Sequence, residues 1–165
     1  MQCRVPRVPR RRGERARRAP VQIPGGLYAD SAAVAEHLLR RPGIAVLVDG
    51  YNVAKLGWPQ LELEAQRERM VVTAEDVAQR WGTDLTVVFD GADIVGASAP
   101  ARRLVRVAFS PAGVSADDLL RAEVDQLPID RSVVVVTNDQ AIVADVRAEG
   151  ANTLGSDQFL AVARR

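Results

Sequence analysis

The sequence predicts an α/β fold in which helices flank a doubly wound, mainly parallel sheet, a three-layer Rossmann-like arrangement. Short apolar, β-branched runs alternate with stretches of helical period, the pattern of successive strand–helix units with right-handed connections. The first run is apolar throughout rather than alternating, as expected for a strand that helices cover on both faces. Polar residues follow these runs, as at the carboxyl edge of an open parallel sheet.

Caps and helix stops give the bounds of the elements. Ser31 is a candidate N-cap for the first helix, and Pro42 and Gly43 end that helix. Gly82 and Gly150 end two later helices. The predicted strands are residues 44–48, 85–89, 104–109, 132–137 and 152–154, and the predicted helices are residues 31–41, 60–81, 115–126, 139–149 and 156–164.

The long helix predicted over residues 60–81 carries a charged residue on its apolar face. That face consists of Leu63, Met70, Ala74, Val77 and Trp81, which recur with a helical period. Arg67 falls on the same face. Its side chain either extends along the edge of the core to reach water or points towards the acidic residues described below, and the sequence leaves both alternatives open.

The composition excludes several classes of site. A chain of 165 residues is long enough for one domain with a core. Cys3 is the only cysteine, which excludes an internal disulfide and a cysteine-rich metal site. His37 is the only histidine, which argues against histidine-ligated zinc and, because no candidate nucleophile lies near it, against a Ser-His-Asp triad. The sequence has no apolar run near the roughly 20 residues of a membrane span and no apolar secretion signal. We therefore expect a cytoplasmic protein with no membrane partner and no disulfide-linked partner.

The N-terminal residues differ from the rest in charge. Residues 1–26 are rich in Arg, Pro and Gly, so we expect a disordered arm or linker there and one domain over residues 27–165. Residues 1–18 hold eight arginines and one glutamate, a net charge of +7, which leaves −6 for the remainder because the whole chain carries +1. The segment is either an arm that binds polyanions or a solvated linker of a longer protein.

Four acidic residues follow the predicted strands. Asp49 and Asp90 come directly after the first two strands, Asp139 follows the fourth, and Asp117 follows the third through a Pro/Gly loop. The carboxyl ends of parallel strands meet at one edge of a sheet, so these side chains should converge. Carboxylates that lie together do not all stay ionised without a cation. The sequence therefore predicts a site for a hard divalent cation, with Asp49, Asp117 and Asp139 as ligands, and metal-assisted chemistry on phosphate.

Local structure offers an alternative explanation for the first two acids. Asp49 and Asp90 each precede a glycine, so each could be a turn residue that binds its own backbone. Asn52 lies one helical turn after Asp49. It could supply a second oxygen ligand or a contact to phosphate, which a turn does not explain.

Helix caps offer an alternative explanation for the other two acids. Ser115 and Asp118 fit a capping box, which does not need Asp117. Any of the three polar residues at 137–139 could cap the next helix, so the cap does not need Asp139. Because each cap requires one residue and more are present, we expect Asp117 and Asp139 to act in the cleft.

Other phosphate-binding motifs are missing from the sequence. Lys55, the one lysine, has no P-loop glycines around it, and there is no GxGxxG run. A phosphatase of the haloacid dehalogenase type would have a second aspartate where Tyr51 stands.

The order of the motifs resembles a known family. The runs DGYN, VVFDG, SADD and VTND, with an arginine-bearing helix after the first, resemble the NYN domain, the branch of the PIN-like nucleases that includes YacP-type bacterial proteins. The resemblance covers residues 43–163. Ser115 stands where threonine is common and Asn138 where serine is common, and neither departure removes an acid. The N-terminal arm lies outside the resemblance and is similar in style to the linker of longer actinobacterial members.

This resemblance implies a PIN-like sheet and a Mg²⁺- or Mn²⁺-dependent endoribonuclease that cuts single-stranded RNA. The positions that match the family are the acids Asp49, Asp90, Asp117 and Asp139, the motif asparagine Asn52 and the helix arginine Arg67. On this basis the four acids are catalytic, and Asn52 and Arg67 bind substrate.

Two other functions remain open from the sequence. The first is an RNA-binding module with a non-catalytic site, acting near ribosomes or in RNA processing. The second is a hydrolase of small phosphate esters in the same fold, because fold alone does not choose the chemistry.

Overall fold

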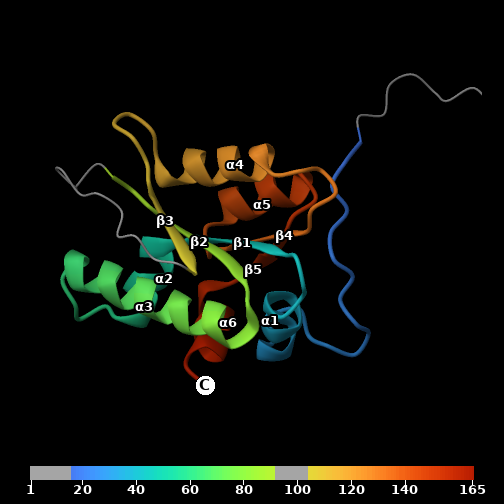
Figure 1. The fold of residues 1–165 in the computed structure, drawn as a ribbon, viewed down its shortest axis with the longest axis horizontal. Coiled ribbons are helices and arrows are strands. Elements are labelled where there is room, and N and C mark those ends of the chain that lie inside the picture. Colours follow the sequence, from blue (N-terminus) through green and yellow to red (C-terminus); the bar gives the residue numbers. More distant parts are fainter. Residues whose placement is uncertain (1–15, 92–103) are drawn as a thin grey trace, which may run out of the picture.

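The computed structural model describes residues 16–91 and 104–165, and within them five parallel strands form one sheet in the order β3-β2-β1-β4-β5 (Figure 1). The strands are β1 (Ala45–Asp49), β2 (Asp84–Phe89), β3 (Val105–Phe109), β4 (Val133–Val136) and β5 (Asn152–Leu154). The helices are α1 (Ala32–Leu39), α2 (Gly50–Gly57), α3 (Leu63–Trp81), α4 (Ala116–Gln126), α5 (Gln140–Ala148) and α6 (Ser156–Ala163). The predicted α/β class with a parallel sheet is confirmed.

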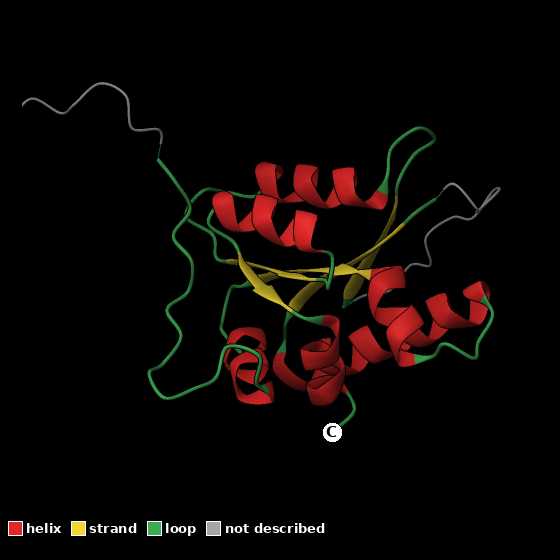
Figure 2. Ribbon diagram, turned by 180° about the vertical axis from the view of Figure 1, so that it is seen from behind, coloured by secondary structure: helices red, strands yellow, loops and turns green. Residues whose placement is uncertain are grey.

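Helices cover both faces of the sheet. α4 and α5 lie on one face, and α1, α2, α3 and α6 lie on the other (Figures 1 and 2). Side chains of β1 alternate between two cores: Val46 and Val48 pack with the larger helical layer, and Ala45 and Leu47 pack with α4 and α5. This double coverage explains why the first predicted strand is apolar at every position.

The structure corrects the start of the long helix. The helix was predicted from residue 60, but α3 begins at Leu63, whose side chain is 38% exposed. The reason is a turn before it, where the Gln66 amide donates to the carbonyl oxygens of Trp58 and Leu61 at 3.1 and 3.0 Å. The rest of the apolar face is confirmed by the buried Met70, Ala74 and Val77, whereas Trp81 is only partly buried.

The structure also corrects part of the expected N-terminal disorder. Arg18 is buried, and its guanidinium donates to the carbonyl oxygens of Val124, Leu127, Pro128 and Arg131 at the end of α4. Val21 exchanges two hydrogen bonds with the Asn152 side chain, at 2.7 and 3.0 Å. Arg18 and Val21 therefore hold this part of the N-terminal segment against the domain. Residues 1–15 lie outside the described part, so for them the arm remains a prediction.

Candidate active site at the carboxyl edge of the sheet

The parallel sheet brings the predicted acids to its carboxyl edge. Asp49 is the last residue of β1, Asp90 follows β2, Asp117 lies in the first turn of α4, and Asp139 is the N-cap of α5 after β4. Their charges interact, since Asp117 and Asp139 raise the pKa of Asp49, and Asp139 and Asp90 raise the pKa of Asp117. The four acids therefore stand at the same edge of the sheet, and their joint role in one site stays a prediction.

Asp49 is the most buried acid of the group, with 8% of its surface exposed. Its Oδ2 accepts a hydrogen bond from the Thr137 hydroxyl at 2.9 Å. Burial raises the pKa of Asp49 to about 6, the Thr137 hydrogen bond opposes this rise, and the charges of Asp117 and Asp139 add to it. A carboxylate in this position gains more than an exposed one from a nearby cation.

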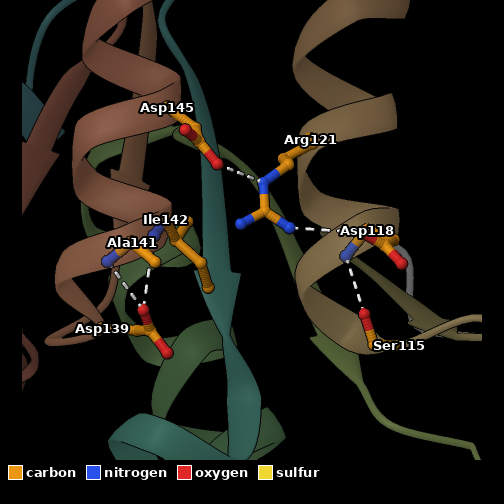
Figure 3. Close-up of polar contacts among 7 residues, drawn as sticks. All are labelled: Ser115, Asp118, Arg121, Asp139, Ala141, Ile142 and Asp145. Atoms are coloured by element: carbon orange, nitrogen blue, oxygen red, sulfur yellow. Dashed lines mark hydrogen bonds and ion pairs between the residues drawn. The ribbon is translucent and has the colours of Figure 1, made fainter.

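Asp117 is half-buried in the first turn of α4. Burial raises its pKa first, the charge of Asp139 raises it further, and the Arg121 guanidinium lowers it. Ser115 caps α4 as predicted, accepting from the Asp118 N–H at 3.1 Å. Asp118 instead turns its carboxylate to Arg121 at 3.2 Å rather than completing a capping box (Figure 3).

Asp139 is the cap of α5. Its Oδ1 accepts from the N–H groups of Ala141 and Ile142 at 2.9 and 3.3 Å (Figure 3). From the sequence, Thr137 or Asn138 could cap this helix and leave Asp139 free. That expectation is wrong, because the Asp139 side chain is the one that accepts from the free N–H groups. In the described part of the chain no donor reaches its Oδ2, so that oxygen remains for a cation.

Asn52 holds two loops together. Its Oδ1 accepts from the Asn138 N–H at 3.0 Å and from the Ser156 hydroxyl at 2.6 Å. The oxygen that was one candidate for a second ligand is thus used by the protein itself. The amide nitrogen, a donor, is the part that suits a phosphate oxygen.

Arg67 meets a neutral partner, which is neither of the two alternatives left open above. Its NH1 donates to the Tyr51 hydroxyl at 2.9 Å, and the side chain is half-buried. In the described chain Arg67 forms no ion pair with the acids. It therefore crosses from α3 to the start of α2 instead of neutralising the acidic group.

Asp90 sits against the end of β3. The Ser110 hydroxyl lies 3.5 Å from its Oδ1 and accepts from the Gly91 N–H at 3.0 Å. A Cβ at Gly91 would stand 2.2 Å from the Ser110 carbonyl oxygen, so this close approach requires glycine. The close approach of Ser110 at the end of β3, and not a turn, therefore accounts for the glycine.

Comparison with known proteins agrees with this geometry. The sequence model of the YacP-like NYN domain matches residues 46–165. The chain belongs to this family. The YacP-like NYN domain lies among the PIN-like nucleases, which points to a ribonuclease.

Solved structures similar to this NYN domain include Rae1 (YacP) from Bacillus subtilis and a mutant of it. They share 24% and 23% sequence identity with the chain, and both have a TM-score of 0.61. Each comparison covers 73% of this chain and 73% or 74% of the other. At this identity the likeness shows the fold alone. The comparison with curated proteins gave no match.

Sequence reasoning missed two contributors to the site of the NYN domain. Thr137 was considered only as a helix cap, yet its hydroxyl binds Asp49. Arg121 was not considered, yet it pairs with Asp118 and Asp145 beside the acids (Figure 3). The signal for Thr137 was a hydroxyl at the end of a strand that is buried on both sides, where a polar group needs a partner.

The donor set of the NYN domain fits a hydrated hard cation. Among the described residues, no three acidic, histidine or cysteine side chains stand close enough to hold a metal ion as they are. Carboxylate oxygens are nevertheless the ligands that Mg²⁺ and Mn²⁺ prefer, and Mg²⁺ keeps several waters while binding one or two carboxylates. The buried Asp49 and the open Oδ2 of Asp139 meet that requirement.

Within the described residues no helix is both long and apolar enough to cross a membrane.

Proposed function

We propose that the protein is a cytoplasmic, Mg²⁺- or Mn²⁺-dependent endoribonuclease that hydrolyses phosphodiester bonds of single-stranded RNA. The observation that carries the proposal is the coupling of Asp49, Asp117 and Asp139 at one edge of the sheet, where burial and like charges raise the pKa of Asp49 to about 6. Membership of the YacP-like NYN domain family supports RNA as the substrate.

Each acid has a distinct role in this proposal. Asp49, Asp117 and Asp139 would hold the cation partly through its coordinated waters, because no three of the described acids stand close enough to bind it together, and Asp90 would support Asp117 from the end of β2. A bound divalent cation supplies an acidified water and stabilises charge on the scissile phosphate. The Thr137 hydroxyl keeps one oxygen of Asp49 in place, which orients the other towards the cation.

Two residues are proposed to bind substrate. The Asn52 amide nitrogen donates to a phosphate oxygen or to a water, because the oxygen of the same amide is held by Asn138 and Ser156. Arg67 supplies a positive charge beside the acids for a neighbouring phosphate.

Single-stranded RNA is favoured over a duplex because the acids lie on an edge that a flexible strand can follow closely. The arginine-rich N-terminal residues would add salt-dependent affinity for RNA or for a ribosome.

A substrate panel tests this function. Purified protein is incubated with single-stranded RNA, with duplex RNA and with p-nitrophenyl phosphate, each with Mg²⁺, Mn²⁺ or EDTA. We expect internal cleavage of the single strand with either metal and none with EDTA. Turnover of the ester without action on RNA would identify a small-substrate phosphohydrolase. RNA binding without cleavage under any condition would identify a binding module.

A further inference from the structure

Two basic side chains, Lys55 on α2 and Arg67 on α3, contact the same tyrosine. Among the described residues, five arginines form ion pairs with carboxylates: Arg40, Arg106, Arg121, Arg131 and Arg165. In the same part of the chain Lys55 and Arg67 are in no ion pair, as is also true of other arginines such as Arg69 and Arg80. A cation kept near the substrate without a carboxylate partner is free to bind an anion.

Tyr51 joins these two cations into one surface. The Lys55 ammonium lies 5.6 Å from the centroid of the Tyr51 ring, and Arg67 donates to the Tyr51 hydroxyl at 2.9 Å. Both contacts leave the positive charges in place, because an aromatic ring and a hydroxyl carry no net charge. We call Tyr51, Lys55 and Arg67 the Tyr51 shelf.

The position of the Tyr51 shelf is fixed by packing. The Tyr51 ring meets Phe89 edge-on at 5.0 Å, and Phe89 stacks on Phe109 at 5.8 Å. A Cβ on Gly50 would lie 2.4 Å from the Phe89 ring, so α2 starts in direct contact with β2. The Tyr51 ring is therefore held in place before any ligand arrives, which lowers the entropic cost of binding at this position.

The shelf is also accessible. Lys55 is exposed, and Tyr51 and Arg67 are half-buried. Tyr51 comes two residues after Asp49, and Lys55 comes four residues further along α2, so Lys55 lies about 9 Å from Asp49 along the helix axis. This spacing separates the Lys55 ammonium from Asp49, so that Lys55 can bind a phosphate next to the one at the acidic group.

We propose that the Tyr51 shelf binds the backbone phosphates of single-stranded RNA that adjoin the scissile phosphate. The inference rests on the proposed nuclease function and extends it by giving the path of the strand. RNA leaves the acidic group across α2 and α3, two packed helices that carry Lys55 and Arg67. The opposite path, across α4 and α5, is unfavourable because Asp118 and Asp145 already occupy Arg121 (Figure 3).

Salt-dependent RNA binding tests the shelf without relying on cleavage. The probe is a short labelled oligouridylate, bound to the full chain in EDTA. Lys55→Gln and Arg67→Gln are each expected to reduce the slope of log affinity against log salt by about 0.7, or about five-fold in Kd near 0.1 M salt. Arg69→Gln is the matched control, because Arg69 is an exposed arginine on the same helix, on a different side from Arg67. If Lys55→Gln and Arg67→Gln both bind RNA with the affinity and salt dependence of Arg69→Gln, the Tyr51 shelf does not bind RNA.

Chemical labelling gives a second readout that needs no variant at the shelf. Lys55 is the only lysine, so acetylation of its amine, followed by peptide mass spectrometry, reports on one side chain. We expect the oligouridylate to slow this acetylation several-fold, relative to a lysine peptide in the same tube, in both the wild type and Asp49→Asn. An unchanged rate at saturating RNA would overturn the proposal. Protection of Lys55 without cleavage of RNA would support the Tyr51 shelf and reject the nuclease function. Cleavage of RNA without protection of Lys55 would support the nuclease function and reject the shelf.

Discussion

The hydroxyl of Thr137 binds the carboxylate of Asp49 at 2.9 Å, and the same oxygen accepts the N–H of Asp139 at 3.1 Å. One threonine at the end of β4 thus connects the acid that ends β1 with the acid that caps α5. The hydroxyl has one proton to donate, and Asp49 receives it. The separation of two proposed metal ligands is therefore set by a residue that is itself neutral.

Thr137→Val should impair cleavage more than it impairs folding. Valine keeps the shape but leaves a buried Asp49 oxygen without its donor, which costs about 1–3 kcal/mol of unfolding free energy. We expect cleavage to fall by at least about ten-fold as the Asp49 carboxylate loses its orientation. Urea unfolding and RNA cleavage measure the two effects.

Thr83→Val is the control for that substitution. The Thr83 hydroxyl is similarly buried and donates to the Leu39 carbonyl at 2.8 Å, away from the acids. It should lose comparable stability and keep its cleavage rate. Equal loss of cleavage in both variants would mean that Thr137 acts only through stability.

Asp49→Asn should stabilise the metal-free protein at neutral pH. The pKa of Asp49 is raised from 3.8 to about 6 in the folded protein, so ionisation of this group opposes folding. The cost is absent below the unfolded pKa, grows between the two values and is complete above about 6. The shift in pKa corresponds to at most about 3 kcal/mol of unfolding free energy. We expect Asp49→Asn to raise the unfolding free energy by about 1–2 kcal/mol at neutral pH.

Urea unfolding at about pH 8 and about pH 5 checks this sign, because the gain should shrink at the lower pH. Asp84→Asn is the control, since Asp84 is an exposed partner of Arg131 and its loss should bring no gain. Destabilisation by Asp49→Asn at the higher pH would show that ionised Asp49 is favourable in the folded state.

Divalent cations should stabilise the protein in a pH-dependent way. A cation that binds only the folded state raises the melting temperature, and protons compete with it at Asp49 as the pH falls through about 6. We expect a larger Mn²⁺-induced shift at about pH 8 than at about pH 5. Thermal melts with Mn²⁺ or EDTA measure this change in melting temperature. An equal change in Asp49→Asn would mean that Asp49 is not a metal ligand.

Arg18→Gln should destabilise the domain although it lies near the N-terminus. Arg18 is buried and serves four carbonyl groups at the end of α4, so its loss should cost about 2–3 kcal/mol. The exposed Arg17 is the matched control, and Arg17→Gln should change stability by less than about 0.5 kcal/mol. Equal melting temperatures for the two variants would mean that residues 16–26 do not contribute to folding.

Sequence predicted the strands and the edge where the acids meet because those depend on local pattern. The apolar run of β1 and the acid that ends it are adjacent in the chain. Because the strands are parallel, their carboxyl ends lie at the same edge of the sheet. The role of Asn52 could not be predicted, because Asn138 and Ser156 reach its oxygen from residues far along the chain. Arg18 was missed for the same reason, since a basic, proline-rich composition gives no sign of a burial site over 100 residues away.

Helix α2 shows a different limit. The DGYN run looks like a turn because glycine follows aspartate, yet Gly50 opens a helix whose start is pressed against Phe89. The glycine is required by that close approach and not by a turn. Only the tertiary contact distinguishes the two explanations.

Single-turnover cleavage of a labelled single-stranded RNA with Mn²⁺ tests the central claim most directly, by comparing wild type, Asp49→Asn and Asp84→Asn. Asp84 provides the same substitution at the opposite end of the sheet, where β2 begins. We predict cleavage by the wild type and Asp84→Asn, a loss of at least about a hundred-fold in Asp49→Asn, and none in EDTA. Cleavage by Asp49→Asn at the wild-type rate would contradict the assignment of the active site to the carboxyl edge.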